Sequence, residues 1–218
     1  MVDNRQHMDP ARITELLRPF TGDAELPAGM LEQFRLYLDL LLRWNARINL
    51  TAVRDPEQIV MRHFGESLFA ARMLDSHAAG PITLADVGSG AGFPGIPIKL
   101  WAADVKLTLI ESQNKKATFL REALRTLKLD RSHVFCGRAE QWGQTADLVT
   151  LRAVEKFERA LPVAAALVGQ GGKLCLLIGS SQMKSVRALS GEPWTWHDPF
   201  PVPLSTGRVI AIGERRTS

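Results

Sequence analysis

A glycine-rich turn constrains the fold of this chain more than any other part of its sequence. Residues 84–95 read LADVGSGAGFPG, so an apolar run is followed at once by four glycines within eight residues. Glycine adopts positive φ without a steric penalty and lets a ligand approach the main chain. A turn of this composition between a strand and a helix is typical of open α/β sheets, which bind ligands at the carboxyl ends of their strands.

After residue 82, short apolar runs alternate with helical segments. We expect strands within residues 82–88, 106–112, 133–137, 146–154, 171–179 and 207–214, and a helix within residues 114–129. This βαβ rhythm predicts an α/β fold with a doubly wound, mostly parallel sheet. A Pro-rich stretch at residues 191–203 precedes the last strand.

The first 75 residues have a different pattern, because their apolar positions recur at helical spacing. One helix start is well marked, with Asp55 as N-cap, Pro56 at the first helical position and Gln58 three residues after the cap. No linker or repeat divides the chain. We therefore expect a helical N-terminal cap, residues 1–75, and a Rossmann-like domain, residues 76–218, in one compact unit.

The turn contains two overlapping ligand motifs, which predict different cofactors. Asp86, Gly88, Gly90 and Gly92 form the Asp-x-Gly-x-Gly-x-Gly loop of S-adenosylmethionine (SAM) methyltransferases. Gly90, Gly92 and Gly95 form the Gly-x-Gly-x-x-Gly fingerprint of dinucleotide-binding proteins. The glycines alone do not decide between them.

Two carboxylates near the turn bear on this choice. Glu111, 23 residues after Gly88 at the end of the second expected strand, suits the ribose hydroxyls of either cofactor. Asp86 discriminates, because a carboxylate below the loop repels a pyrophosphate but suits the cationic ammonium and sulfonium groups of SAM. We interpret the turn as a SAM site, with a dinucleotide site or a ligand-free structural turn as alternatives.

The ends of the third and fourth expected strands supply further candidates. Glu140, in the loop CGRAEQW, is positioned to accept a hydrogen bond from an adenine amine, although a solvated surface acid explains it equally well. The fourth strand ends in TLRAVEKF, which has neither the Asn/Asp-Pro-Pro-aromatic motif of amine methylation nor a cysteine nucleophile. An acceptor that attacks unaided, such as guanine N7, remains. We expect Arg152 to be the catalytic residue, which would orient that acceptor or the cofactor. The alternative is that Arg152 forms a structural ion pair.

In several motifs the chain resembles the bacterial 16S rRNA guanine-N7 methyltransferase family, RsmG or GidB. The resemblance covers about residues 30–180, and the motifs that carry it are WNARINLT (44–51), RH followed by ES (62–67), DVGSGAGFPGIP (86–97), Glu111, RAE (138–140) and RAV (152–154). It implies a class I SAM-dependent methyltransferase fold with a mostly parallel seven-stranded sheet. It also implies methyl transfer from SAM to N7 of a guanine in the 530 loop of 16S rRNA.

The resemblance also implies SAM contacts at Gly88, Phe93, Ala139, Glu140 and Arg152. Three positions depart from the family pattern. Glu66 stands where the family often has aspartate, Leu151 where it has serine, and Ile178 where it usually has lysine. If that lysine contacts RNA or a phosphate, another cation must replace it, and Lys173 and Lys184 are the candidates.

Several cations follow one another in sequence beside the expected cofactor site. We hypothesise that Arg47, Arg54, Arg62 and His63 contact RNA phosphates, together with Asn49. Asn49, like Thr51, is equally explained as a residue that terminates a helix. The aromatic residues of this half, Phe34, Trp44 and Phe64, are expected in the core because they recur at helical spacing.

Composition limits the remaining choices. The net charge of +4 and the pI near 9.3 permit an anionic partner, and no apolar run approaches the length of a membrane span. Cys136 and Cys175 lack the neighbours of a metal site. We therefore expect a cytoplasmic, monomeric, metal-free enzyme that acts on 16S rRNA, in the 30S subunit or its precursor. A small-molecule SAM methyltransferase and a non-catalytic SAM- or dinucleotide-binding protein are the alternatives.

Overall fold

A computed structural model of the chain describes residues 8–75, 82–152, 156–189, 191 and 193–217. The strands are β1 (Thr83–Val87), β2 (Lys106–Glu111), β3 (Ser132–Cys136), β4 (Ala146–Arg152), β5 (Val168–Gly179), β6 (Trp194–Trp196), β7 (Phe200–Pro201) and β8 (Arg208–Arg215). The α-helices are α1 (Pro10–Thr21), α2 (Ala28–Asn45), α3 (Pro56–Ile59), α4 (Glu66–Asp75), α5 (Gly95–Trp101), α6 (Asn114–Thr126), α7 (Phe157–Ala166) and α8 (Met183–Arg187).

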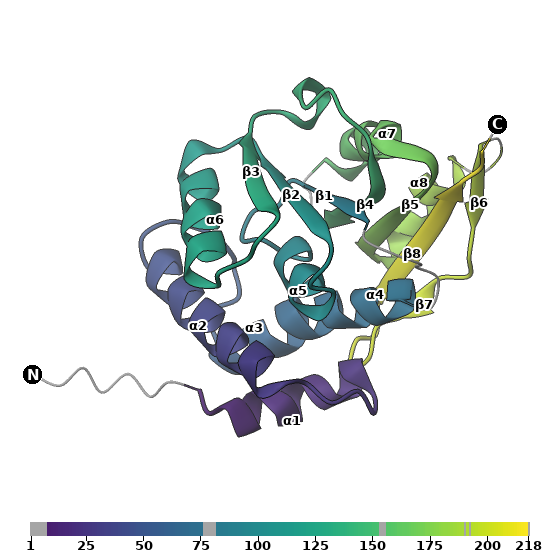
Figure 1. Ribbon diagram of the computed structural model, residues 1–218. Coiled ribbons are helices and arrows are strands. Elements are labelled where there is room, and N and C mark those ends of the chain that lie inside the picture. Colours follow the sequence, from purple (N-terminus) through teal and green to yellow (C-terminus); the bar gives the residue numbers. More distant parts are fainter. Residues whose placement is uncertain (1–7, 76–81, 153–155, 190, 192, 218) are drawn as a thin grey trace, which may run out of the picture.

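The sheet has the strand order β3-β2-β1-β4-β5-β8-β6, and the two-residue strand β7 pairs with β8 beside this path (Figure 1). Strands β1 to β5 pair in parallel, whereas β8 is antiparallel to β5, β6 and β7. All six strands expected from the apolar runs are present. The predicted mostly parallel, seven-stranded sheet is confirmed as the main path, and β7 adds a short eighth strand.

Different helices cover the two faces of the sheet. In β1, Leu84 belongs to a cluster with α1, α2, α4, α5 and α6, whereas its neighbour Ala85 belongs to a cluster with α7. The alternation continues in β2, where Leu109 and Ile110 face opposite sides. Both faces are therefore apolar, as expected for parallel strands covered by helices. Phe34 and Phe64 lie in the first cluster, fully buried, and Trp44 packs against it half-buried.

The helical N-terminal half begins where the sequence indicates but is less regular than expected. Asp55 is the N-cap of α3 and accepts a hydrogen bond from the Gln58 amide at 2.8 Å. Between α3 and α4, residues Val60–Gly65 form a π-helical segment, so the helical stretch that begins at Asp55 has an irregular middle. A π segment contains one extra residue per turn, a local change that apolar spacing does not reveal.

The Pro-rich stretch before the last strand contains two short strands, β6 and β7, which the apolar runs did not indicate. Trp194 of β6 is buried against the α7 face, and Trp196 packs on the sheet at Gly213 of β8. A Cβ atom at Gly213 would lie 2.9 Å from the Trp196 ring, so a glycine at this position lets the edge strand approach. Strands this short give little alternation to recognise.

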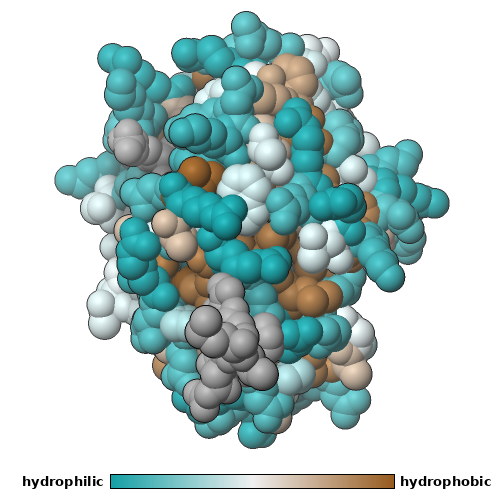
Figure 2. Space-filling model, turned by 90° about the vertical axis from the view of Figure 1, so that its left-hand side faces the viewer, coloured by the Kyte–Doolittle hydropathy of each residue, from teal (hydrophilic) through white to brown (hydrophobic). Residues whose placement is uncertain are grey.

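The outer surface is mainly polar. Figure 2 shows the face on the left in Figure 1, where α2 and α6 lie, largely covered by hydrophilic residues, with hydrophobic ones visible in scattered areas. Within the part of the chain that the structure describes, no helix combines the length and the apolar character needed to cross a bilayer.

The turn between β1 and α5 has the main-chain geometry that its glycines permit. Gly88, Gly90 and Gly92 have φ of 66°, 56° and 88°. Tyr37 of α2 is fully buried and donates its hydroxyl hydrogen to the carbonyl oxygen of Ala91 in this turn. The N-terminal helices therefore hold the turn from one side, while β1 and α5 hold it at its ends.

The space around two of these glycines differs, which gives a test of this packing. A Cβ atom at Gly92 would lie 2.5 Å from Ile96 Cδ1 and 2.6 Å from the Tyr37 hydroxyl, whereas at Gly90 only the Gly88 carbonyl oxygen lies within 4 Å. We expect Gly90→Ala to cost about 1 kcal/mol through its positive φ alone. Gly92→Ala adds overpacking and should cost roughly 3 kcal/mol.

Urea unfolding of both variants measures these losses. Gly90→Ala is the matched control, because both substitutions share the positive φ and only one meets neighbouring atoms. Equal losses in the two variants would mean that Tyr37 and Ile96 do not confine the turn.

Candidate functional site

A cavity of about 680 Å³, here called the main cavity, lies at the carboxyl ends of the parallel strands. Its walls come from the turn after β1, the last residues of β2 and β4, the first turn of α6, the loop after α2, the π-helical segment and the first residue of β8. The lining residues are Asn49, Leu50, Thr51, Ala52, Val53, Arg62, His63, Gly88, Ser89, Gly90, Ala91, Phe93, Glu111, Gln113, Lys116, Arg152 and Arg208. The glycine turn and the end of the fourth strand therefore meet in one space.

A second cavity of about 260 Å³, the side cavity, lies next to the first and shares Gly88 with it. It is lined by Val87, Gly88, Ile110, Ser112, Gly137, Arg138, Ala139 and Glu140. Ala139 and Glu140 begin a short 3-10 turn after β3, and the Glu140 side chain is exposed and pairs with Arg138 at 3.2 Å. A hydrogen bond to its own main chain lowers the pKa of Glu140, and the pairing with Arg138 lowers this pKa further.

Glu111 ends β2 and points into the main cavity, with only 5 % of the residue exposed. Its Oε2 atom accepts a hydrogen bond from the Gly90 amide at 3.0 Å, and Oε1 accepts one from the Gln113 amide at 2.8 Å. Each carboxylate oxygen has a second lone pair for a ligand hydroxyl. A ribose diol beside a Gly-rich main chain fits these donors and acceptors, so the residues present suit a nucleoside cofactor.

Asp86 lies beneath the turn and does not line either cavity. Its Oδ1 atom accepts a hydrogen bond from the Thr150 hydroxyl at 2.7 Å, and Oδ2 accepts one from the Gly95 amide at 3.3 Å. Burial raises the pKa of Asp86 to about 6, although both hydrogen bonds act in the opposite direction. The carboxylate, expected to face the cationic groups of SAM, instead joins β1, β4 and α5 below the turn.

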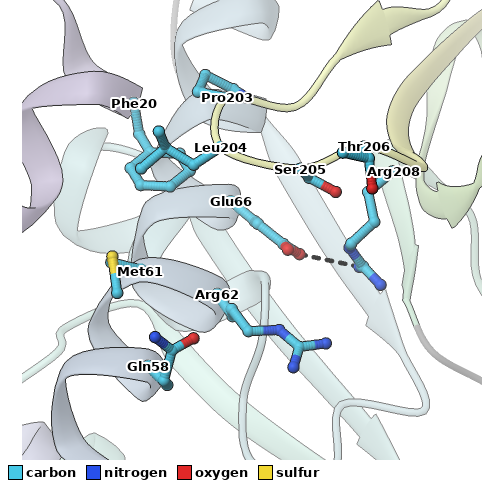
Figure 3. Close-up of a pocket in the computed structure, with 10 residues that line it drawn as sticks. All are labelled: Phe20, Gln58, Met61, Arg62, Glu66, Pro203, Leu204, Ser205, Thr206 and Arg208. Carbon is cyan, nitrogen blue, oxygen red and sulfur yellow. Dashed lines mark ion pairs between the residues drawn. The ribbon is translucent and has the colours of Figure 1, made fainter.

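Arg152, at the end of β4, is held by three contacts, all through Nη2. This atom donates to the Arg62 carbonyl oxygen at 2.6 Å and to His63 Nδ1 at 2.9 Å, and it pairs with Glu66 Oε2 at 3.1 Å. Arg208 pairs with the same Glu66 oxygen at 2.9 Å, as Figure 3 shows. One carboxylate from α4 therefore joins an arginine at the end of β4 to an arginine at the start of β8.

The ionic cluster of Glu66, Arg152 and Arg208 carries more positive than negative charge. The side chains of Glu66 and Arg152 are 4 % and 7 % exposed, and the Nε atoms of Arg152 and Arg208 are buried with no hydrogen-bond partner. Burial lowers the pKa of Arg152 to about 10, helped by the charge of Arg208 and opposed by Glu66, so the guanidinium stays protonated near neutral pH. An electron-rich ligand group is well suited to such a site.

His63 supports Arg152 as a neutral ring. A guanidinium only donates hydrogen bonds, so His63 Nδ1 must be the acceptor and Nε2 carries the proton. Nε2 lies 2.7 Å from the Thr51 hydroxyl oxygen, to which it donates. Burial and then the charge of Arg152 lower the pKa of His63 to about 3. Both ring nitrogens are engaged within the protein, which is not the arrangement of a phosphate-binding cation.

The loop after α2 is organised by Asn45, a residue that sequence reasoning missed. Its Oδ1 atom accepts from the Leu50 and Thr51 amides at 2.9 and 3.0 Å, and its Nδ2 atom donates to the Thr51 carbonyl oxygen at 3.0 Å. The helix itself ends at Asn45. Asn49 therefore does not terminate it, and lines the main cavity as an exposed residue.

The expected RNA-contacting arginines lie at different distances from the main cavity. Arg62 is exposed and lines it, whereas Arg47 and Arg54 are exposed outside its lining. Two lining cations, Lys116 and Arg208, were not among the sequence candidates. Arg208 could have been found from topology, because the start of an antiparallel strand lies level with the carboxyl ends of its parallel neighbours.

The candidate replacements for the family lysine are not at this edge. Lys173 pairs with Glu214 at 3.2 Å, Lys184 is exposed on α8, and neither lines the main cavity. Ile178 is buried in the cluster on the α7 face. Arg208, opposite Gly179 in the sheet register, is the cation that reaches the cavity from this side.

Comparison with known structures and sequences agrees with this geometry. The fold is similar to Pyrococcus horikoshii TYW2 in complex with MeSAdo, with 16 % identity, a TM-score of 0.58, and coverage of 72 % of this chain and 63 % of that one. It is also similar to the ribosomal protein L11 methylase of Lactobacillus delbrueckii subsp. bulgaricus, with 17 % identity, a TM-score of 0.56, and coverage of 72 % and 80 %. These similarities define the fold as the Rossmann-like fold of class I SAM-dependent methyltransferases.

The sequence comparison identifies the family. Residues 30–196 match the family model of GidB, rRNA small subunit methyltransferase G. Proteins named ribosomal RNA small subunit methyltransferase G are 40 % identical in Xanthomonas euvesicatoria pv. vesicatoria (84 % of this chain, 82 % of that one) and 34 % identical in Bacillus subtilis (86 % and 83 %). The chain belongs to this methyltransferase family, as its motifs predicted.

The described residues contain no group of three or more His, Cys, Asp or Glu side chains arranged to hold a metal ion.

The buried His63 gives a pH-dependent prediction. In the unfolded chain an ordinary histidine binds a proton below about pH 6.5, but folded His63 does so only near pH 3. The unfolded state therefore takes up the proton first, and this contribution to stability is lost as pH falls from about 6.5. Relative to His63→Gln, the wild type should lose about 2 kcal/mol of unfolding free energy between pH 7 and pH 5.

Urea unfolding of both proteins across this range measures the difference. The wild type is compared with His63→Gln because Asp86 also changes the unfolding free energy with pH. Its raised pKa acts in the opposite direction to His63, and this contribution is the same in both proteins. Parallel stability curves would contradict a His63 that stays neutral.

Proposed function

We propose that this protein transfers the methyl group of SAM to N7 of a guanine in the 530 loop of 16S rRNA. The observation that carries the proposal is the Arg152 guanidinium in the same cavity as the glycine turn, held through one amino group only. The other amino group, Nη1, is then available to a methyl acceptor. Membership of the rRNA small subunit methyltransferase G family supports the same acceptor class.

The proposed cofactor contacts follow the two cavities. Gly88 and Gly90 bring main chain close to the methionine part, and Glu111 binds the ribose hydroxyls. Ala139 and Glu140, in the side cavity, bind the adenine. Asp86, Gly92 and Phe93 act by shaping the turn. In this proposal Asp86 and Gly92 support the site from outside its lining.

Phe93 also supports Arg152. Its ring lines the main cavity, and the Arg152 guanidinium carbon lies 5.8 Å from the ring centroid. A guanidinium over an aromatic face is stabilised by the ring quadrupole. We propose that Phe93 and His63 are positioning residues, which act through Arg152 rather than on the acceptor itself.

The chemistry requires positioning more than proton transfer. SAM supplies a methyl group bonded to a cationic sulfur. Guanine N7 has a lone pair and no proton, so the protein needs no general base when the N7–carbon bond forms and the carbon–sulfur bond breaks with its electron pair left on sulfur. O6 and N7 lie on one edge of guanine. Arg152 donates to O6 and leaves the N7 lone pair free to attack.

The product purine carries a positive charge, which a nearby guanidinium alone would disfavour. Glu66 contributes one negative charge to the cluster and lies within hydrogen-bond distance of both arginines. We propose that this carboxylate acts by holding Arg152 in place, and that any effect it has on the product charge is exerted through the position of that guanidinium. Glu66 itself does not contact the reacting atoms.

RNA binding would use the cations around the main cavity. We assign Arg62, Lys116 and Arg208 to phosphates near the target, and the exposed Arg47 and Arg54, with Asn49, to more distant contacts. The partner is 16S rRNA in a 30S subunit or its precursor, which places the reaction in the cytoplasm. We propose that the protein acts as a monomer.

A methyl-transfer assay tests this function. The protein is incubated with labelled SAM and either 16S rRNA or 30S subunits from a strain that lacks the corresponding gene, followed by nucleoside analysis and mapping. We expect label in 7-methylguanosine of the 530 loop. Arg152→Ala should slow transfer by about 100-fold, and SAM affinity should change far less.

Arg159→Ala is the matched control, because Arg159 is exposed on α7 outside both cavities. Its transfer rate should equal that of the wild type. Label in another nucleoside, or no label in either RNA while SAM still binds, would contradict the proposed acceptor.

A further inference from the structure

A third cavity, of about 330 Å³, lies beside the main cavity and is not needed for the cofactor or the target base. We call it the hairpin cavity, because the loop between β7 and β8 forms one wall and the π-helical segment forms the other (Figure 3). It is lined by Phe20, Gln58, Met61, Arg62, Glu66, Pro203, Leu204, Ser205, Thr206 and Arg208. Arg62 and Arg208 also line the main cavity, so the two spaces share a cationic wall.

The hairpin cavity has an apolar end and a charged end. Figure 3 shows Phe20 and Leu204 at one end and the guanidinium groups of Arg62 and Arg208 toward the other. A nucleotide has the same division, with a flat base at one end and a phosphate at the other. Arg152 and Arg208 both pair with the single carboxylate of Glu66, and the exposed Arg62 lines the same wall, so positive charge exceeds negative charge there and favours an anionic ligand group.

Leu204 is the feature that points to a missing contact. Among the described residues it is the one large hydrophobic side chain that is exposed, at 74 %, and its φ is +57°. A left-handed conformation is unfavourable for leucine, and so is an exposed isobutyl group. The loop is nevertheless fixed, because the Val202 amide donates to the Arg208 carbonyl oxygen at 3.0 Å and the Ser205 amide to the Val202 carbonyl oxygen at 3.3 Å.

We propose that the hairpin cavity binds the unstacked base of a nucleotide next to the target guanine. Leu204 packs on the face of that base, Gln58 and Thr206 offer hydrogen bonds to its edge, and Arg62 and Arg208 bind the phosphate between the two nucleotides. This inference rests on the proposed RNA methylation in the main cavity. RNA segments that are read in sequence commonly present unstacked bases to such mixed apolar and polar pockets.

The proposal is tested from both sides of the contact. On the protein, Leu204→Asn removes the apolar contact and keeps a residue that tolerates positive φ. Gln58→Trp fills the cavity from the opposite wall, where Gln58 is exposed. Gln144→Trp is its matched control, because Gln144 is an exposed residue just before β4. It therefore lies at the amino-terminal end of that strand, away from the carboxyl ends at which the cavities lie.

On the RNA, two 16S rRNA substrates are made by ligation, with an abasic nucleotide on the 5′ or the 3′ side of the target guanine. For the wild type, one of them should raise KM about 10-fold, as expected for one lost base contact. Leu204→Asn and Gln58→Trp should raise KM for unmodified RNA to a similar extent. With that abasic RNA, the KM of these two variants should rise no further. Their SAM affinity and kcat should equal those of the wild type, and Gln144→Trp should have the wild-type KM.

The outcomes separate this inference from the proposed function. Normal transfer by the wild type with unchanged KM for both abasic RNAs and both variants would overturn the hairpin cavity as a base site and leave the proposed function intact. The inference would also be overturned if the increase in KM caused by a variant and the increase caused by the abasic RNA multiplied when the two were combined. A defect of the variants that appears only with 30S subunits would assign the cavity to a ribosomal protein instead. No transfer by the wild type to any unmodified RNA would contradict the proposed function itself.

Discussion

The contact of Glu66 with Arg152 and Arg208 is the constraint on which the site depends. It joins the start of α4, the end of β4 and the start of β8 at a single carboxylate oxygen, with N···O distances of 3.1 and 2.9 Å. Buried ion pairs add little net stability, but removing one partner leaves an uncompensated charge and costs about 3–5 kcal/mol. The cluster therefore fixes the positions of these segments, and through them the wall shared by the main and hairpin cavities.

The N-terminal helices belong to the site as much as the sheet does. Tyr37 of α2 holds the turn at Ala91, and its ring stacks with Phe64 and Phe93 at centroid distances of 5.2 and 5.3 Å. His63, in the π-helical segment, lies 5.0 Å from the Phe93 ring and accepts a hydrogen bond from Arg152. A Rossmann-like sheet with a glycine turn is common to many enzymes, and this helical wall gives the main cavity its particular shape and charge.

Strong local signals allowed much of the fold to be predicted. The apolar runs identified the six longest strands, and the Asp55 cap identified the start of α3. The π-helical segment and strands β6 and β7 were missed, because short or irregular elements depend on tertiary packing. For the site, the turn and strand ends were correctly brought together, but the side-chain direction of Asp86 and the approach of Arg208 depend on the whole sheet.

The central claim is that Glu66 acts through Arg152, and a double-mutant cycle tests it most directly. Single-turnover methyl-transfer rates would be measured for Glu66→Gln, Arg152→Lys and the double variant, with SAM and RNA saturating. If the carboxylate only holds the guanidinium in place, each single variant is slow and the double variant is no slower than Arg152→Lys. Rate losses that multiply in the double variant would contradict the account, because Glu66 would then act on the reaction independently of Arg152.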